Sequence, residues 1–509
     1  MRKIWLKTSF ICGIIVLMVG ASVVSAFNGN PSISSKPMDR GNWLYVGGSG
    51  PGNYSKIQDA IDNASDGDTV FVYDDSSPYY ENIIIDKTIS LIGEDKNTTI
   101  IDSGGVGNGV YVSADLVNIN EFTIQNSTEN AIFLDSCNHT TFVSNVIRGS
   151  NFALKLVDSN DNQICDCQIF NNIWGINIAS NIGASAKNNI ITNCQIFNNA
   201  LLGLHIWSSS NNTIQNNTFV SDSIAIVGSL EDCYQNIDTT NTVNGKPVYY
   251  FLNEKDMIID NWDIGELILI NCTGFLIKNI EISGADAGFE VAYSSNNTIS
   301  NCDFSNNLFG LELWNSAYNR IENNTANKNT GFFISTGGWP SSGISIIGTH
   351  NIVRNNNASN NLIGIFLLWS TGNTIEGNTI SKNNITGVYI VNSSDNIIYH
   401  NNFVGNTQNA YDNGTNSWDD GKKGNYWDDY TEKYPDAHKK WGKGIWDTPY
   451  EIPGGDNVDR YPLLKQWPNA LSLLIPKINI FNFNFIILLQ RLIERFPHAF
   501  PILRHLLGY

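Results

Sequence analysis

The sequence predicts an all-β protein, a right-handed parallel β-helix of about a dozen coils, because it contains a short structural repeat. Twelve segments begin with Gly or Ala and then place apolar residues at alternate positions, and most successive starts lie 22 residues apart, give or take one. The twelve starts are Gly109, Ala131, Ala153, Gly175, Gly203, Ala225, Gly265, Gly288, Gly310, Gly343, Gly364 and Gly387. A period of this length combined with strand-like alternation is typical of a solenoid.

A second motif, Asn-x-Ile followed by Asn and another apolar residue, places its Ile eleven residues after many of these starts. It begins at Asn162, Asn212, Asn297, Asn319, Asn373 and Asn396. Asn suits tight corners because it tolerates left-handed dihedral angles and its side chain forms hydrogen bonds with its own backbone. We therefore expect an in-register ladder of Asn side chains, which the competing fold, an antiparallel sandwich, would lack.

One repeat shows why the coils must stack. Leu311 and Leu313 point to one side of a strand, and Ile321 does so on a second short strand. A helix is excluded because Gly and Asn recur too often and the apolar period is two. A single repeat cannot bury its apolar side, whereas stacked coils can, and the general rule for parallel crossovers predicts the right-handed sense.

The residue pattern of the N-terminal segment predicts that the protein is exported. Residues 1–26 have the basic start, apolar stretch and small-residue end of a signal peptide, with a retained membrane anchor as the alternative. The mature protein is then expected to be secreted, extracellular or held at the cell surface, with no transmembrane span after signal removal. Residues 27–41 are predicted to be a flexible linker.

The β-helix is predicted over residues 42–410, with covers at its open ends. The period is lost over 228–263, which predicts an excursion, and Asn244-Gly245 inside it is a hairpin signal. Ser55-Lys56-Ile57-Gln58 resembles the capping box of a short helix at the N-terminal end.

The C-terminal end has two further parts. Residues 411–468 are rich in Trp and acids and predict a compact cap. Residues 469–509 form an apolar and basic tail that is too short and too polar in its longest apolar run to span a bilayer. Two interpretations of the tail stay open: it docks to the cell surface or another protein, or it packs on the last coils.

Composition narrows the function classes. The formal net charge is −18, which argues against nucleic acid and anionic membranes as partners. Only 15% of residues are charged, so we expect polar and aromatic binding of a polysaccharide or cell-surface glycan.

Seven cysteines follow the signal segment, and an odd number cannot pair completely. Cys167 and Cys194 hold the same place in their repeats, which leaves a disulfide and a ladder of buried thiols open.

Two kinds of site are predicted on outward positions. The first is a carbohydrate-binding face, because aromatic rings beside polar groups stack on sugars; its candidates are Trp207, Trp314, His205, Phe366 and Tyr389. The second is a glycoside-cleaving pair, Glu290 and Glu312, which lie 22 residues apart and should sit on neighbouring coils. Carboxylates at that separation suit a retaining acid and nucleophile, and solvated surface carboxylates are the alternative.

Several motifs resemble known families. Lys56-Ile57-Gln58-Asp59-Ala60-Ile61 and Asp66-Gly67-Asp68-Thr69-Val70 are similar to the opening of pectate-lyase-like β-helix proteins. The segments 241–250 and 424–430, with Asp447-Thr448-Pro449-Tyr450, resemble the NosD family, the "periplasmic copper-binding" β-helix proteins, and archaeal surface proteins with carbohydrate-binding and sugar-hydrolysis repeats. The resemblance implies the fold and adds copper handling as a role, for which Cys165, Cys167 and Cys194 are the candidate ligands.

No cofactor is predicted. Lysines at 439, 440 and 443 stand where related proteins carry alternating acids that resemble a calcium loop, and calcium and copper stay open without a motif of their own. The favoured function is non-catalytic glycan binding by a secreted or cell-surface protein. The alternatives are a glycoside hydrolase or polysaccharide lyase, and an accessory protein in copper-site maturation.

Overall fold

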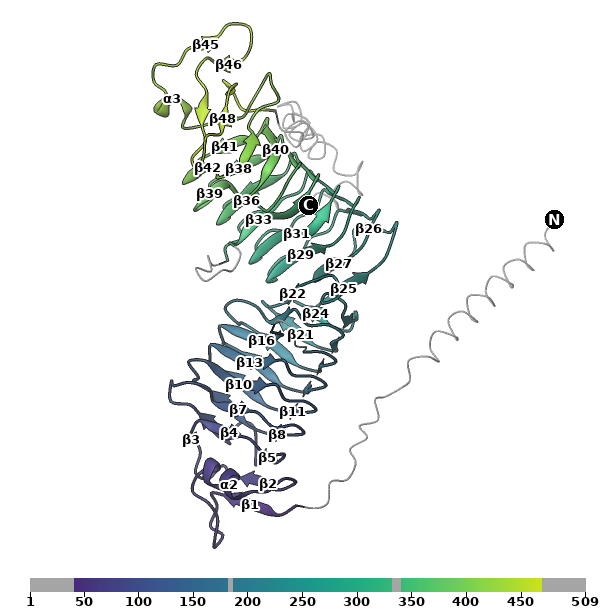
Figure 1. The fold of residues 1–509 in the computed structure, drawn as a ribbon, viewed down its shortest axis with the longest axis vertical. Coiled ribbons are helices and arrows are strands. Elements are labelled where there is room, and N and C mark those ends of the chain that lie inside the picture. Colours follow the sequence, from purple (N-terminus) through teal and green to yellow (C-terminus); the bar gives the residue numbers. More distant parts are fainter. Residues whose placement is uncertain (1–40, 182–185, 332–339, 469–509) are drawn as a thin grey trace, which may run out of the picture.

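The computed structural model describes residues 41–181, 186–331 and 340–468. The predicted signal peptide, nearly all of the predicted linker and the predicted tail lie outside these residues. The described chain winds into a parallel β-helix of about 17 turns with almost no helix, which confirms the predicted class and corrects the expected dozen coils. Figure 1 shows the coils piled into a rod made of two segments, with β22 and β25 at the joint between them.

In the first segment each coil adds one strand to each of three parallel sheets. The first sheet contains β1 (Trp43–Val46), β2 (Thr69–Val72), β5 (Ser90–Gly93), β8 (Asn118–Asn120), β11 (Thr141–Val143), β14 (Gln163–Cys165), β17 (Ile190–Thr192), β20 (Thr213–Gln215) and β23 (Asn236–Ile237). The third sheet contains β4 (Ile83–Ile85), β7 (Val110–Val112), β10 (Asn130–Asp135), β13 (Phe152–Val157), β16 (Trp174–Ala179), β19 (Leu204–Trp207) and β22 (Ile224–Val227).

The second sheet runs through both segments. Its strands in the first segment are β3 (Tyr79–Tyr80), β6 (Ile100–Asp102), β9 (Thr123–Gln125), β12 (Val146–Arg148), β15 (Gln168–Phe170), β18 (Gln195–Phe197), β21 (Thr218–Val220) and β24 (Thr242–Val243). It continues in the second segment with β25 (Lys246–Leu252), β27 (Glu266–Ile270), β29 (Ala287–Ala292), β31 (Phe309–Ala317), β33 (Ser342–Thr349), β36 (Ile363–Leu368), β39 (Thr386–Val391) and β42 (Gln408–Asp412).

Two further sheets complete the second segment. The fourth contains β26 (Ile258–Asp260), β28 (Leu276–Lys278), β30 (Thr298–Ser300), β32 (Arg320–Glu322), β34 (Ile352–Arg354), β37 (Thr374–Glu376), β40 (Ser394–Tyr399) and β43 (Thr415–Ser417). The fifth contains β35 (Asn357–Ser359), β38 (Thr379–Ser381), β41 (Asn402–Val404) and β44 (Tyr426–Trp427).

The core is a column of aliphatic side chains inside the coils, as the alternation predicts. Leu311, Leu313 and Ile321 are all buried, and Leu311 pairs in register with Ile344 of the next coil. The small residue at the segment start has a steric cause at Gly310: a Cβ there would lie 2.3 Å from the carbonyl oxygen of Gly343. Neighbouring coils therefore approach too closely at that point for a larger side chain.

The predicted Asn ladder is present. In the second segment each Oδ1 accepts both the backbone N–H and the Nδ2–H of the Asn one coil before, at 2.8–3.1 Å. This ladder runs through Asn297, Asn319, Asn351, Asn373, Asn396 and Asn416. The Nδ2 groups also reach corner carbonyls, as Asn319 does with Ser294 at 3.0 Å. The Asn side chains thus form hydrogen bonds with the buried backbone groups at the corners, which have no partner in the pairing of the strands.

The joint lies where the period is lost. After β24 the chain turns back in an antiparallel hairpin to β25, and Asn244 and Gly245 at the turn have φ of 51° and 80°, so the predicted hairpin is present. The second sheet continues through this hairpin, whereas the third sheet ends at β22. Residues 228–263 therefore carry the chain from one segment to the next.

Carboxylates replace the missing strand above β22. The N–H of Ile224 donates to Glu266 at 3.1 and 3.2 Å, and the N–H of Ile226 donates to Glu290 at 3.3 Å. Asp286 Oδ2 accepts the N–H groups of Gly203 and Ser223 at 2.8 and 2.7 Å. The joint is therefore closed by side-chain acceptors that reach across from the second segment.

Burial raises the pKa of these carboxyl groups. The pKa of Glu266 and of Asp286 lies well above its ordinary value because burial disfavours the charged form, and the charges of Glu290 and Asp222 respectively add to the effect. Burial also raises the pKa of Asp222 to about 7, although the side chain accepts from Asn199.

The N-terminal end is covered by α2 (Ile57–Asn63), whose Ile57, Ala60 and Ile61 are buried. The predicted capping box is wrong, because the helix begins after Lys56 without a side-chain cap of its own. The carboxylate of Glu81 instead accepts the N–H groups of Ile57 and Gln58 at 2.9 and 3.0 Å. A residue from the next coil therefore supplies the helix cap.

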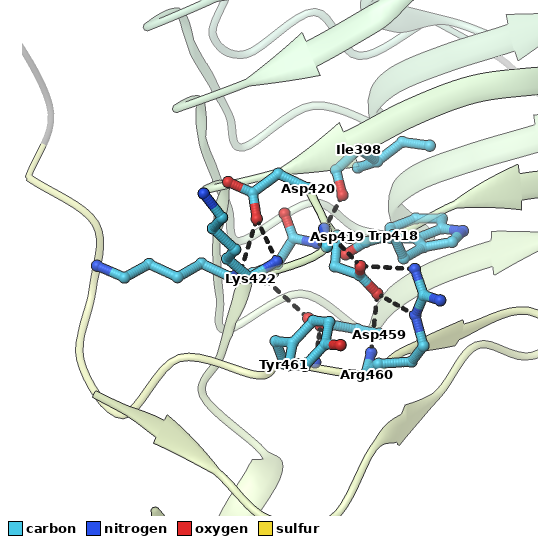
Figure 2. A network of polar contacts seen from close by, with 11 residues as sticks. Ile398, Trp418, Asp419, Asp420, Lys422, Asp459, Arg460 and Tyr461 are labelled. Carbon is cyan, nitrogen blue, oxygen red and sulfur yellow. Dashed lines mark hydrogen bonds and ion pairs between the residues drawn. The ribbon is translucent and has the colours of Figure 1, made fainter. Parts of the chain in front are cut away.

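The C-terminal end is a cap that contains α3 (Tyr430–Lys433), β45 (Lys439–Lys440), β46 (Ile445–Trp446), β47 (Tyr450–Glu451) and β48 (Val458–Asp459). Asp459 ends an amide ladder, since it accepts the N–H of Asn425 at 2.7 Å and the indole N–H of Trp427 at 2.8 Å. Figure 2 shows the neighbouring pair, in which Arg460 donates two hydrogen bonds to Asp419 at 2.8 and 2.9 Å. The motifs around 424–430 and 459–461 thus lock the cap onto the last coils.

A change in the middle of a ladder should destabilise the rod. Asn356 accepts from Asn324 and donates to Asn378 and to the carbonyl of Ile321, so Asn356→Ala leaves several buried groups without partners. We expect a loss of about 2–4 kcal/mol in the free energy of unfolding, measured by urea denaturation. The control is Asn384→Ala, an exposed Asn with no side-chain partner among the described contacts, which should change stability by no more than about 0.5 kcal/mol. Equal effects of the two variants would contradict the structural role of the ladder.

The joint should make stability depend on pH. The pKa of Asp222 is raised in the folded protein to about 7, so between its ordinary value and about 7 the folded state holds a proton that the unfolded state has released. Stability must therefore fall as pH rises through this window, by up to about 4 kcal/mol for this group. Asp222→Asn should flatten the fall between pH 5 and 8 in urea unfolding, whereas the exposed control Asp395→Asn should not. An unchanged pH slope in Asp222→Asn would contradict this assignment.

Candidate functional site

The outer face of the third sheet carries aromatic rings that contact one another from coil to coil. We call this surface the ring face and define it by Tyr111, Phe133, Phe152, Lys155, Trp174, Asn177, His205 and Trp207. Its strands β7, β10, β13, β16 and β19 lie one above another (Figure 1), so the residues follow the axis of the first segment. Except for the buried Asn177 and the exposed Trp207, these side chains are half-buried.

The rings form a nearly continuous series. The centroids of Phe152 and Trp174 lie 5.5 Å apart with an angle of 12° between the planes, and Trp174 lies 5.8 Å from His205. Phe133 is joined to the series by Lys155, whose Nζ lies 5.7 Å from the Phe133 centroid and 5.2 Å from that of Phe152. Adjacent parallel strands impose these spacings, because in-register side chains must stack.

Polar groups lie between the rings. The hydroxyl of Tyr111 donates to Asp135 at 2.8 Å, and the side chains of Asn177 and His205 are hydrogen-bonded at 2.9 Å. Burial lowers the pKa of His205 to about 4, so its imidazole is neutral at physiological pH. Trp207 is 54% exposed at the end of β19. The face therefore offers apolar rings next to uncharged hydrogen-bonding groups.

The structure divides the five predicted carbohydrate-binding residues between the two segments. His205 and Trp207 lie on the ring face, whereas Trp314, Phe366 and Tyr389 lie on the second sheet beyond the joint. Phe366 and Tyr389 stack with centroids 5.9 Å apart, but Phe366 is only 3% exposed and packs in a cluster with Ile347, Ile363 and Leu368. This second group contributes mainly to packing on the outside of the sheet.

Glu290 and Glu312 are neighbours, as their spacing predicts. They pair in register on β29 and β31. Glu290 is 8% exposed and accepts the N–H of Ile226, and its pKa lies well above its ordinary value because of burial and the charge of Glu312. Glu312 is half-buried, and burial raises its pKa to about 7. One member of the pair is thus engaged in the joint.

The cysteines are free thiols, including all three candidate copper ligands. Cys165 is half-buried at the end of β14, whereas Cys167 and Cys194 are buried at the corner that follows. Hydrogen bonding to Cys167 and burial raise the pKa of Cys194 well above its ordinary value, and burial raises that of Cys165 to about 11. The hydrogen bond with Cys194 lowers the pKa of Cys167. Cys165 and Cys194 therefore favour the protonated form, which binds metals poorly, whereas Cys167 is held by its hydrogen bond with Cys194.

Across residues 41–181, 186–331 and 340–468, no cluster of three or more His, Cys, Asp or Glu side chains is arranged to hold a metal ion. Within the same ranges no helix has the length and apolar character needed to cross a lipid bilayer.

Sequence reasoning missed four aromatic members of the ring face. Phe152 and Trp174 directly precede the small residues Ala153 and Gly175 that begin their segments. This position also faces outward: Phe152 and Trp174 are half-buried, and at least two consecutive buried residues follow each of them, so strict alternation does not identify them. Tyr111 and Phe133 could have been found from the sequence. Each stands two residues after a segment start, which is the same outward position that Lys155 and His205 occupy in their repeats.

These observations define a class: a parallel β-helix protein whose rod has a helical cap at one end and a Trp-rich cap at the other. The model of the family described as "Periplasmic copper-binding protein (NosD)" matches residues 61–261 and again residues 235–432. The chain therefore belongs to the NosD family. The two matches meet at the joint, so each corresponds to one segment of the rod.

Comparison with solved structures finds other chains of similar fold. An alginate lyase from Paenibacillus sp. str. FPU-7 is 13% identical, with a TM-score of 0.29, over 74% of this chain and 99% of that one. The pectate lyase Pel9A is 13% identical, with a TM-score of 0.32, over 67% and 80%. A DFA-IIIase from Arthrobacter chlorophenolicus A6 is 11% identical, with a TM-score of 0.33, over 71% and 95%. A search of curated proteins finds no match.

Thiol titration distinguishes the two states of Cys167 and Cys194 that the sequence leaves open. In a chain without residues 1–26, all seven thiols should react with Ellman's reagent in denaturant, because the structure holds them free. In the native protein only Cys165 should react quickly, and Cys165→Ser should remove that phase, since the other six thiols are buried. A titre lower by two in denaturant would indicate a disulfide and contradict the free thiols.

Proposed function

We propose that this protein is an exported, non-catalytic binding protein that holds a polysaccharide on the ring face. The observation that supports the proposal is the ring series itself. Sugar rings stack on aromatic faces, and their hydroxyl groups need uncharged donors and acceptors nearby. Trp174, His205 and Asn177 provide both within neighbouring coils.

Binding rather than cleavage is favoured by the state of the carboxyl pair. A retaining glycosidase needs both carboxyl groups at the scissile bond. Glu290 is enclosed and accepts a backbone N–H of β22, so it is not free to attack a sugar carbon. Its position is explained by the joint, where it replaces an absent strand.

The residues present do not fit a copper site, although the description of the family names copper. Copper binding in proteins draws on clusters of thiolate, thioether or imidazole ligands. Cys165 and Cys194 favour the protonated form, the candidate thiols are separated between a strand end and a buried corner, and the described residues hold no metal-binding cluster. No step of the proposed function therefore involves copper.

The proposal is tested by glycan binding with matched tryptophan variants. The wild-type protein should bind at least one polysaccharide on a glycan array without releasing products, and Trp174→Ala should weaken that binding about tenfold because it removes a stacking ring. The control is Trp441→Ala, which removes a 99% exposed tryptophan in the cap and should leave binding unchanged.

Thermal unfolding of both variants shows whether they are still folded, so that a loss of affinity can be assigned to the missing ring and not to unfolding. The proposal is contradicted if no glycan binds, if Trp441→Ala and Trp174→Ala weaken binding equally, or if the bound polymer is cleaved.

A further inference from the structure

The ring face is electrically neutral on a strongly acidic protein. Among the residues of β7, β10, β13, β16, β19 and β22, the charged side chains are Lys155 and Asp135, and their charges cancel. His205 adds no charge near neutral pH, because burial lowers its pKa to about 4. The whole chain carries a formal charge of −18.

The neutral face is bordered by acids at the joint. The strands of the second sheet that follow the joint, β27, β29 and β31, carry Glu266, Glu290 and Glu312 and no Lys or Arg. Of these, Glu312 is half-buried on the outer face. Burial raises the pKa of all three carboxyl groups, so they favour the uncharged form, and it is the net charge of the whole protein that repels a polyanion at long range.

The one cation of the face is already occupied. Lys155 Nζ lies over the rings of Phe133 and Phe152, at 5.7 and 5.2 Å from their centroids. A single ammonium group engaged in this way cannot neutralise the successive carboxylates of a polyuronate chain, which would require a row of Lys or Arg side chains.

The ring contacts also give the ligand a direction. Phe152, Trp174 and His205 come from three successive coils, β13, β16 and β19, and contact one another in that order. Stacking surfaces therefore follow one another along the rod axis, across the strands. A chain of sugar rings that stacks on them must lie in the same direction.

We infer that the ligand is an uncharged polysaccharide that lies along the long axis of the rod on the ring face. This inference rests on the proposed function and narrows it to one chemical class. The neutral polymer stacks on the rings and exchanges hydrogen bonds with Asn177 and the neutral His205. Acidic polymers are repelled by the net negative charge of the protein and find no row of cations on the face.

The test compares neutral oligosaccharides of increasing length with oligouronates by isothermal titration, at about 20 and about 500 mM salt. Affinity for the neutral series should rise with length over several sugar units and then level off, and should change less than threefold between the two salt concentrations. The exposed control Lys382→Gln should leave the affinity for the neutral series unchanged.

Different results would contradict the neutral ligand class, its axial placement and glycan binding itself. Binding confined to oligouronates, weakened more than tenfold by salt or by Lys155→Gln, would overturn the inference while leaving glycan binding intact. Neutral binding that does not rise with length would overturn the axial placement. Failure of every oligosaccharide to bind would overturn both the proposed function and this inference.

Discussion

The structure depends on one constraint: each coil must supply hydrogen-bond acceptors for the N–H groups of the coil before it. Between strands the backbone carbonyls do this, and at the corners the Oδ1 atoms of Asn do it, as in the pairing of Asn319 with Asn351. A stack of this kind has no intrinsic end, since its last coil always leaves donors unpaired. Where the rod ends, the last coil therefore needs a side chain that accepts its hydrogen bonds but has no N–H donor of its own that requires a further coil.

Carboxyl groups meet that need at several places where a sheet or a ladder stops. Asp459 ends one ladder in the cap, Asp222 ends another in the first segment, and Glu266 and Glu290 cover the edge of β22. The functional consequence is local. Because the third sheet stops at this edge, the outer face of the first segment becomes a bounded surface, with a neutral row of rings on one side of the joint and acids on the other.

Periodicity allowed much of this architecture to be predicted. The alternation identified core residues such as Leu311 and Leu313, and the Asn motif identified the ladder, because both patterns repeat at a fixed spacing. The number of coils was underestimated because the first coils do not begin with Gly or Ala; β4, for example, begins at Ile83. The helix cap was misassigned because Glu81 lies 24 residues after Ile57.

The excursion and the hairpin at the joint could be predicted from the sequence, but the contacts that close the joint could not, because they join residues far apart in the chain. Asp286 accepts from Gly203, which lies 83 residues earlier, and no local pattern marks such a pair. The 22-residue spacing predicted the pairing of Glu290 with Glu312, and outward position predicted His205 and Trp207 as surface residues. Neither pattern predicted that Glu290 also accepts the N–H of Ile226 on β22.

Hydrogen exchange of the β22 backbone tests the central claim most directly. If side-chain carboxylates replace the missing strand, the amide protons of Ile224 and Ile226 should exchange as slowly as those of strands inside the third sheet, and substituting Glu266 by Ala should release Ile224 selectively. Fast exchange of both amides in the wild-type protein, as at a free sheet edge, would contradict the account.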